Sequence, residues 1–131
     1  MPQVFNFMQN QKSSINSLEW FANYYVGKSI LIGVTYYDHD GNFIEQKQVH
    51  GVIKSIDPES IRITLKGAHE GKSWSLPPDF DAIKEARQGT YILKSTGEEV
   101  STDLISTWVL TLPPGEKVPR DFEDAGGFQR K

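Results

Sequence analysis

Apolar and polar residues alternate along much of this chain, with the period of two that is typical of strands having one buried face. The alternation is clearest in two runs, Ser29 to Asp38 and Phe43 to Ile56, on either side of the polar segment His39-Asp40-Gly41-Asn42. An Asp-Gly pair between two such runs indicates a β-hairpin, because Gly readily adopts the positive φ that the turn requires. The pattern therefore predicts one long hairpin.

A short helix is predicted just before the hairpin. One apolar stripe at helical spacing is formed by Leu18, Phe21, Ala22 and Tyr25. Asn16 and Glu19 have the spacing of a capping box, so the helix should begin at about Ser17. Gly27 stands where a left-handed C-terminal cap is expected.

A turn centred on Asp40-Gly41 predicts the register of the hairpin. The expected cross-strand pairs are Ile30 with Gly51, Ile32 with Val49, Val34 with Lys47 and Tyr36 with Glu45. The base of the hairpin is apolar and its tip is polar, so the part from Tyr36 to Phe43 is expected to project into solvent. Gly33 and Gly51, inside strand patterns, predict bends or bulges.

The rest of the chain predicts further short strands. They are Ile61 to Leu65, Ser73 to Leu76, Thr90 to Ser95 and Ile105 to Leu112. Residues 79–87 predict one or two helical turns. The fold class is therefore mainly β, a small bent-sheet barrel of about six antiparallel strands with one N-terminal α-helix. Residues 1–13 are expected to form an arm, residues 14–112 the single barrel domain, and residues 113–131 a flexible C-terminal tail.

Composition limits the classes of function. A length of 131 residues suits one domain, and the lack of cysteine excludes disulfides and thiolate chemistry. Neither a membrane span nor a signal peptide is recognisable, so we expect a cytoplasmic protein. A net charge of −3 argues against general binding to nucleic acid. Basic residues lie close together in the chain, but their alternation with apolar residues is typical of the solvated face of a strand; they are Lys54, Arg62, Lys66 and Lys72.

The first half of the chain, about residues 17–65, resembles the small barrels of the Sm-like and Src-homology-3-like type. The residues that carry the resemblance are the helix end Val26-Gly27-Lys28, the strand from Ile30 to Val34, the turn Asp40-Gly41 and the strand from Gly51 to Asp57. The resemblance implies a small β-barrel. RNA binding is not carried over, because Ile105-Ser106-Thr107-Trp108 is unlike the second signature of the Sm family. Two short stretches, Leu76 to Asp79 and Ser95 to Glu98, look similar to uncharacterised bacterial proteins.

No motif predicts catalysis, a metal or a cofactor. The segment from Asp38 to Asn42 begins like a calcium loop, but its Gly is at the fourth position and its flanks are strands. His39, His50 and His69 lack the spacing of a zinc site. Neither a nucleophile elbow nor a phosphate loop is present. We therefore expect a protein that is not an enzyme.

Aromatic side chains beside acidic ones make protein binding the preferred class of function. The candidate binding residues are Tyr36, Tyr37, Asp38, His39, Asp40 and Trp74. Trp74 near Pro77-Pro78 could instead be a core residue. The sequence thus predicts a non-enzymatic interaction module, for example of immunity type, with a basic protein partner; exposed strand edges are compatible with a homodimer. The alternatives are a lipocalin-like binder of small ligands and an Sm-like RNA-binding protein.

Overall fold

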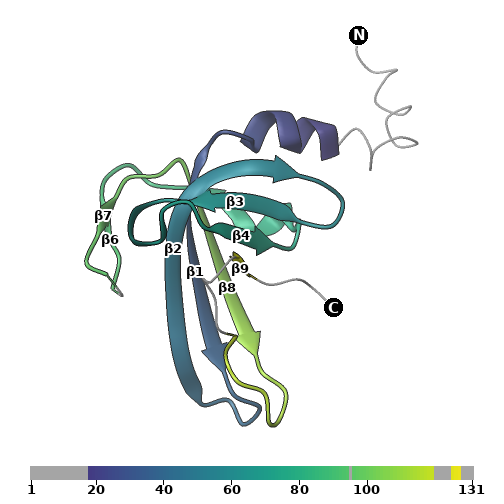
Figure 1. Ribbon diagram of the computed structural model, residues 1–131, viewed down its shortest axis with the longest axis vertical. Helices are drawn as coiled ribbons and strands as arrows, with labels where there is room; N and C mark the ends of the chain where they lie inside the picture. The colour runs from purple at the N-terminus through teal and green to yellow at the C-terminus, as the bar shows by residue number, and fades with distance from the viewer. Residues whose placement is uncertain (1–17, 95, 120–124, 128–131) are drawn as a thin grey trace.

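A computed structural model describes residues 18–94, 96–119 and 125–127 (Figure 1). Over these residues the protein is mainly β, with a short N-terminal helix at residues 18–25 and two single turns of 3-10 helix, η1 (Gly67–His69) and η2 (Phe80–Ala82). The strands are β1 (Ser29–Tyr37), β2 (Phe43–Ile56), β3 (Ile61–Leu65), β4 (Ser73–Leu76), β5 (Ile83–Glu85), β6 (Tyr91–Ile92), β7 (Glu99–Val100), β8 (Leu104–Thr111) and β9 (Ala125–Gly127).

The N-terminal helix ends where the sequence predicts. Gly27 comes two residues after the last helical residue, Tyr25, and has a φ of 94°, the left-handed conformation expected of a C-terminal cap. Its N–H donates to the carbonyl oxygen of Ile53 at 2.9 Å, and the Ile53 N–H donates to the Lys28 carbonyl oxygen at 3.0 Å. The end of the helix is therefore fastened to β2. The predicted capping residue Asn16 and the predicted helix start at Ser17 lie outside the described residues.

The long hairpin of β1 and β2 has the predicted register. All four expected pairs are present: Ile30 with Gly51, Ile32 with Val49, Val34 with Lys47 and Tyr36 with Glu45. The irregular pairs of the hairpin strands lie elsewhere than at Gly33 and Gly51: the register shifts between Tyr36 and Tyr37 and between Ile53 and Ser55. Gly51 has another role, since a Cβ built there would overlap the Thr64 carbonyl oxygen on β3.

The prediction of a closed antiparallel barrel is wrong. The main sheet has seven strands in the order β5-β8-β1-β2-β3-β4-β9, and it stays open. It is also mixed, because β8 runs parallel to β1 and β9 runs parallel to β4. Figure 1 shows that β2 curves strongly, so that β3 and β4 lie across the upright ribbon of β1, β2 and β8. The bend folds the sheet over itself, but the outer strands β5 and β9 do not pair.

The second half of the chain departs from the prediction in three places. Residues 79–87 contain one helical turn, as predicted, but it is only the three-residue η2, which Asp79 caps; the short strand β5 follows, and its Ile83 pairs with Ser106 on β8. The strand expected from Thr90 to Ser95 is shorter, and β6 pairs with β7 in a separate two-stranded sheet. The segment predicted as a flexible tail contains β9, which pairs with β4.

Two hydrophobic clusters hold the sheet. The larger one lies on the inner face of the bent sheet and includes the fully buried Ile30, Ile32, Val34, Ile53, Ile63 and Trp74. The smaller one lies where the β6–β7 hairpin packs on the ribbon, and its buried members are Leu31, Leu93 and Val100. The sheet is therefore covered on both faces in the first half of β1. This explains why β1 is apolar at consecutive positions from Ile30 to Ile32.

Asp103 joins the start of β1 to the start of β8. Its Oδ2 accepts hydrogen bonds from the Ser29 N–H at 3.1 Å and from the Ser29 hydroxyl at 3.0 Å. The Ser29 backbone N–H, above all, lowers the pKa of the Asp103 carboxyl from its usual value. A carboxyl whose pKa is lower in the folded than in the unfolded protein stabilises the fold above the unfolded pKa, about 3.9. That stabilisation is lost as the pH falls through the lower, folded value.

We therefore expect the free energy of unfolding, measured with urea, to decrease below pH 4 in the unaltered protein. The decrease should be smaller in Asp103→Asn. Asparagine keeps an acceptor oxygen for Ser29 but does not titrate. The same acid dependence in both proteins would show that Asp103 does not contribute to it.

Candidate functional site

The tip of the hairpin is a rigid acidic turn. Asp38 accepts hydrogen bonds through Oδ1 from the N–H groups of Asp40 and Asn42, each at 2.9 Å. Gly41 has a φ of 88°. The Asn42 backbone N–H is the main cause of a lowered pKa of Asp38. Asp38 is therefore a charged group that shapes the turn, while His39 and Asp40 beside it are exposed.

The structure separates the six predicted binding residues into two groups. Tyr36 is 1% exposed and Trp74 is 0% exposed, so both side chains belong to the core and cannot serve as surface contacts. Tyr36 follows the alternation of Ile32 and Val34 on the inner face of the ribbon, and Trp74 lies opposite Ile63. The other four residues lie together at the tip: Tyr37, Asp38, His39 and Asp40.

Phe43 adds an apolar group to the tip that the sequence analysis did not select. Its side chain is 62% exposed, and its ring lies edge-on to Tyr37 with 6.2 Å between the ring centroids. Ile44 next to it is 41% exposed. The exposed aromatic surface of the tip is thus carried by Tyr37 and Phe43, without Tyr36.

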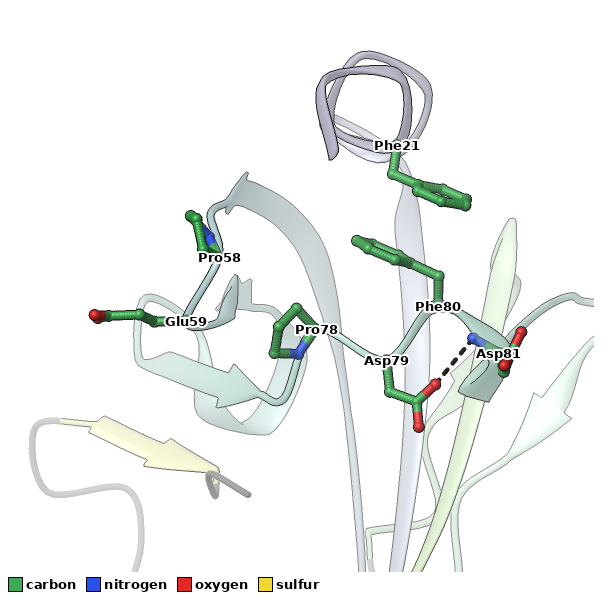
Figure 2. Close-up of a pocket in the computed structure, with 7 residues that line it drawn as sticks. All are labelled: Phe21, Pro58, Glu59, Pro78, Asp79, Phe80 and Asp81. Atoms are coloured by element: carbon green, nitrogen blue, oxygen red, sulfur yellow. Dashed lines mark hydrogen bonds between the residues drawn. The ribbon is translucent and has the colours of Figure 1, made fainter. Parts of the chain in front are cut away.

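A second surface is a groove between the N-terminal helix and the turns that follow β2 and β4. It has a volume of about 950 Å³ and is lined by Phe21, Pro58, Glu59, Pro78, Asp79, Phe80 and Asp81. Figure 2 shows the rings of Phe21 and Phe80 facing each other. They are stacked with an interplanar angle of 8° and 4.0 Å between centroids. We call this surface the aromatic groove.

The polar groups of the aromatic groove are acidic and lie at its two ends. Figure 2 shows Glu59 on the turn after β2 with its side chain directed away from the rings, Asp79 below Phe80, and Asp81 on the side of Phe80 that is away from Glu59. The Asp81 N–H donates to Asp79 Oδ1 at 3.1 Å, so this hydrogen bond positions the first residues of η2. None of the described lining residues is basic. The groove therefore combines an aromatic and proline wall with negative charge at both ends.

The arrangement of the groove follows from local sequence. Pro58 and Glu59 belong to the turn that Asp57 forms by accepting the N–H groups of Glu59 and Ser60 at 2.8 and 2.9 Å. After β4, the pair Pro77-Pro78 ends the strand, because proline cannot donate to a neighbouring strand. The chain then turns toward the helix, where Phe80 meets Phe21.

The described residues give no sign of a metal centre or a membrane segment. No group of three or more His, Asp or Glu side chains in the described ranges is placed to hold a metal ion. Within the same ranges, the helices are too short or too polar to cross a membrane.

Comparison of the chain with protein-family models, curated proteins and solved structures finds no match.

Proposed function

We propose that this protein is a non-enzymatic protein-interaction module, and that its aromatic groove binds a basic segment of a partner protein. The observation that carries the proposal is the stacked pair Phe21 and Phe80, bordered by carboxylates at both ends of the groove. A matching segment has an apolar or aromatic side chain in its middle and a Lys or Arg on each side. An immunity-type protein that covers a basic surface of its target is one concrete form of this function.

Physical chemistry favours such a ligand over an acidic or purely apolar one. The faces of Phe21 and Phe80 that are not turned toward each other can attract cations by about 0.5–1 kcal/mol where they are exposed, and Arg can also stack on them. Glu59 and Asp81 are exposed and carry negative charge, which speeds the approach of a basic partner. The net charge of −3 acts in the same direction.

The hairpin tip is the other surface that supports binding to a basic partner. Asp38 and Asp40 lie in the same turn as the exposed Phe43, but these tip residues do not line the aromatic groove. The lipocalin-like alternative requires a closed barrel, and the sheet is open. The Sm-like alternative requires a ring of subunits with a basic pore.

The proposal is tested with short peptides in which one Leu or Trp is flanked by Arg or Lys. We expect saturable binding, followed by NMR chemical-shift changes at Phe21, Glu59, Phe80 and Asp81. The double variant Glu59→Lys/Asp81→Lys should weaken binding by about tenfold or more, because it replaces attraction by repulsion at both ends. The same peptides with Glu in place of the basic residues should not bind.

The matched control is Asp40→Lys/Glu45→Lys, which changes the net charge equally but at the exposed hairpin tip. It should bind the peptides nearly as well as the unaltered protein, apart from a small loss from the change in net charge. Loss of binding in this control with retention in the groove variant would assign the contact to the tip. Absence of saturable binding to any basic peptide would reject the groove as a peptide site.

A further inference from the structure

The outer edge of β8 is only partly covered. In the described part of the chain, β5 pairs with β8 at Leu104, Ile105 and Ser106, and the pairing stops there. Beyond this pairing, Thr107, Val109 and Thr111 have no partner strand on the outer side of β8 among the described residues. Unpaired N–H and C=O groups along such an edge are a template for another strand.

The opposite edge of the ribbon is protected in ways that natural edge strands commonly use. Along β2, Glu45 and Lys47 bring charge to the edge, and the register is irregular near the tip. The Gln48 side chain is also engaged, because its Oε1 accepts the Lys94 N–H at 2.6 Å. Charges and irregular pairing on this edge oppose the addition of a strand.

Among the described residues, the outer edge of β8 at Thr107, Val109 and Thr111 has none of these protections. The whole strand, Leu-Ile-Ser-Thr-Trp-Val-Leu-Thr, contains no charged residue, no Pro and no Gly. It pairs with β1 without an interruption of register. Val109 in its middle is 64% exposed, with the exposed Thr107 and Thr111 on either side. The β8 edge is thus regular, uncharged and rich in residues that favour strands.

We propose that this edge binds the same edge of a second copy of the chain, in an antiparallel pair related by a two-fold axis at Val109. Thr107 of each copy then lies opposite Thr111 of the other. Val109 lies opposite its own equivalent, where the two side chains remove each other from water. The main sheets of both copies join into one continuous sheet.

The strand is complementary to itself, which is why a second copy is the partner. A two-fold axis perpendicular to the sheet keeps the exposed face of one strand next to the exposed face of the other. Thr–Thr and apolar cross-strand pairs are both favourable in antiparallel sheets. Trp108 and Leu110 stay on the inner face, where they pack against the larger core cluster.

The contact is small, so the dimer should depend on protein concentration. Stable interfaces bury about 1,200–2,000 Å² in total, and a single pair of short strands buries less. We therefore expect a reversible equilibrium between monomer and dimer.

Cross-linking of a single-cysteine variant tests the geometry directly, because the protein contains no cysteine. In Val109→Cys, two copies of the thiol should face each other, with Cβ atoms about 4.5–5.5 Å apart. Mild oxidation should then convert most of the protein into a disulfide-linked dimer at concentrations where the unaltered protein dimerises. Ile92→Cys is the matched control, since Ile92 is 67% exposed and lies on β6 in the separate two-stranded sheet; it should cross-link much more slowly.

Sedimentation equilibrium over a wide concentration range gives the second measurement. The unaltered protein and Ile92→Lys should dimerise equally, whereas Val109→Lys should raise the dissociation constant by about tenfold or more through repulsion across the axis. Circular dichroism should show that both variants are folded. A protein that is monomeric at every concentration, or a dimer that Val109→Lys leaves unchanged, would overturn the proposal.

Discussion

Replacing Gly51 by alanine is expected to destabilise the protein by about 3 kcal/mol, near the upper end of the cost of overpacking. A Cβ at Gly51 would meet the Thr64 carbonyl oxygen and would lie 2.8 Å from the Leu65 Cα. Both atoms belong to the backbone of β3, so no rotation of a side chain can relieve the overlap. Separating β2 from β3 would disturb the pairing on which the bend of the sheet depends.

Urea unfolding of Gly51→Ala and Gly33→Ala measures this effect with a matched control. Gly33 is also inside the hairpin, but a Cβ there would meet nothing within 4 Å, and its φ is not positive. Gly33→Ala should therefore change the free energy of unfolding by less than about 0.5 kcal/mol. Equal effects of the two substitutions would mean that the close approach of β3 to Gly51 is not what requires glycine.

Replacing Trp74 by alanine should cost about 3–5 kcal/mol, the range observed when a buried Trp is truncated. The side chain is fully buried between strands, with Ile63 opposite it on β3 and Gly126 opposite it on β9. Its removal leaves a cavity in the larger core cluster. Because total stabilities of domains are commonly about 5–15 kcal/mol, Trp74→Ala could unfold much of the protein at 37 °C.

Trp20→Ala is the control for Trp74→Ala. Trp20 is 56% exposed and stacks on Tyr24, so its loss should cost less than about 1 kcal/mol. Unfolding should be followed by circular dichroism, since each substitution also removes a fluorophore. If Trp74→Ala were as stable as Trp20→Ala, then Trp74 would not be a core residue.

The hairpin could be predicted in detail because its signals are local. The turn residues Asp40-Gly41 and the alternation on both sides permit one register that keeps Ile30 and Ile32 on the buried side. A shift by one residue would move every buried side chain to the other face. The helix end at Gly27 is another local signal, carried by one residue with a positive φ.

The arrangement of the remaining strands could not be predicted in the same way. The alternation in β8 indicates a strand but not its partner, and the parallel pairing with β1 joins residues as distant as Ile30 and Leu104. β5 comes directly after the turn η2, which Asp79 caps. In the sequence this segment therefore resembles the start of a helix. β9 contains Gly126 and Gly127, which carry no alternation at all.

The candidate site was only partly visible in the sequence. The position of Asp38 and Asp40 at the tip could be predicted from the turn signal. The burial of Tyr36 could not, because it depends on how far the core extends along the ribbon. The aromatic groove joins Phe21 with Phe80 from separate segments, so only the folded structure brings them together. One sequence signal pointed toward the groove: Phe80 comes soon after Pro77-Pro78, where the chain must leave the sheet.

The parallel pairing of β1 and β8 also has a consequence for how the chain acquires its fold. β1 can pair with β2 as soon as both have been synthesised, but Ser29 and Asp103, at the starts of β1 and β8, are 74 positions apart. Contacts between such distant segments form slowly, because a long loop must close first. Until Leu104 to Thr111 leave the ribosome, β1 keeps one open edge. A nascent chain that stalls before this point therefore presents β1 as the open edge of an incomplete sheet, which is prone to aggregation.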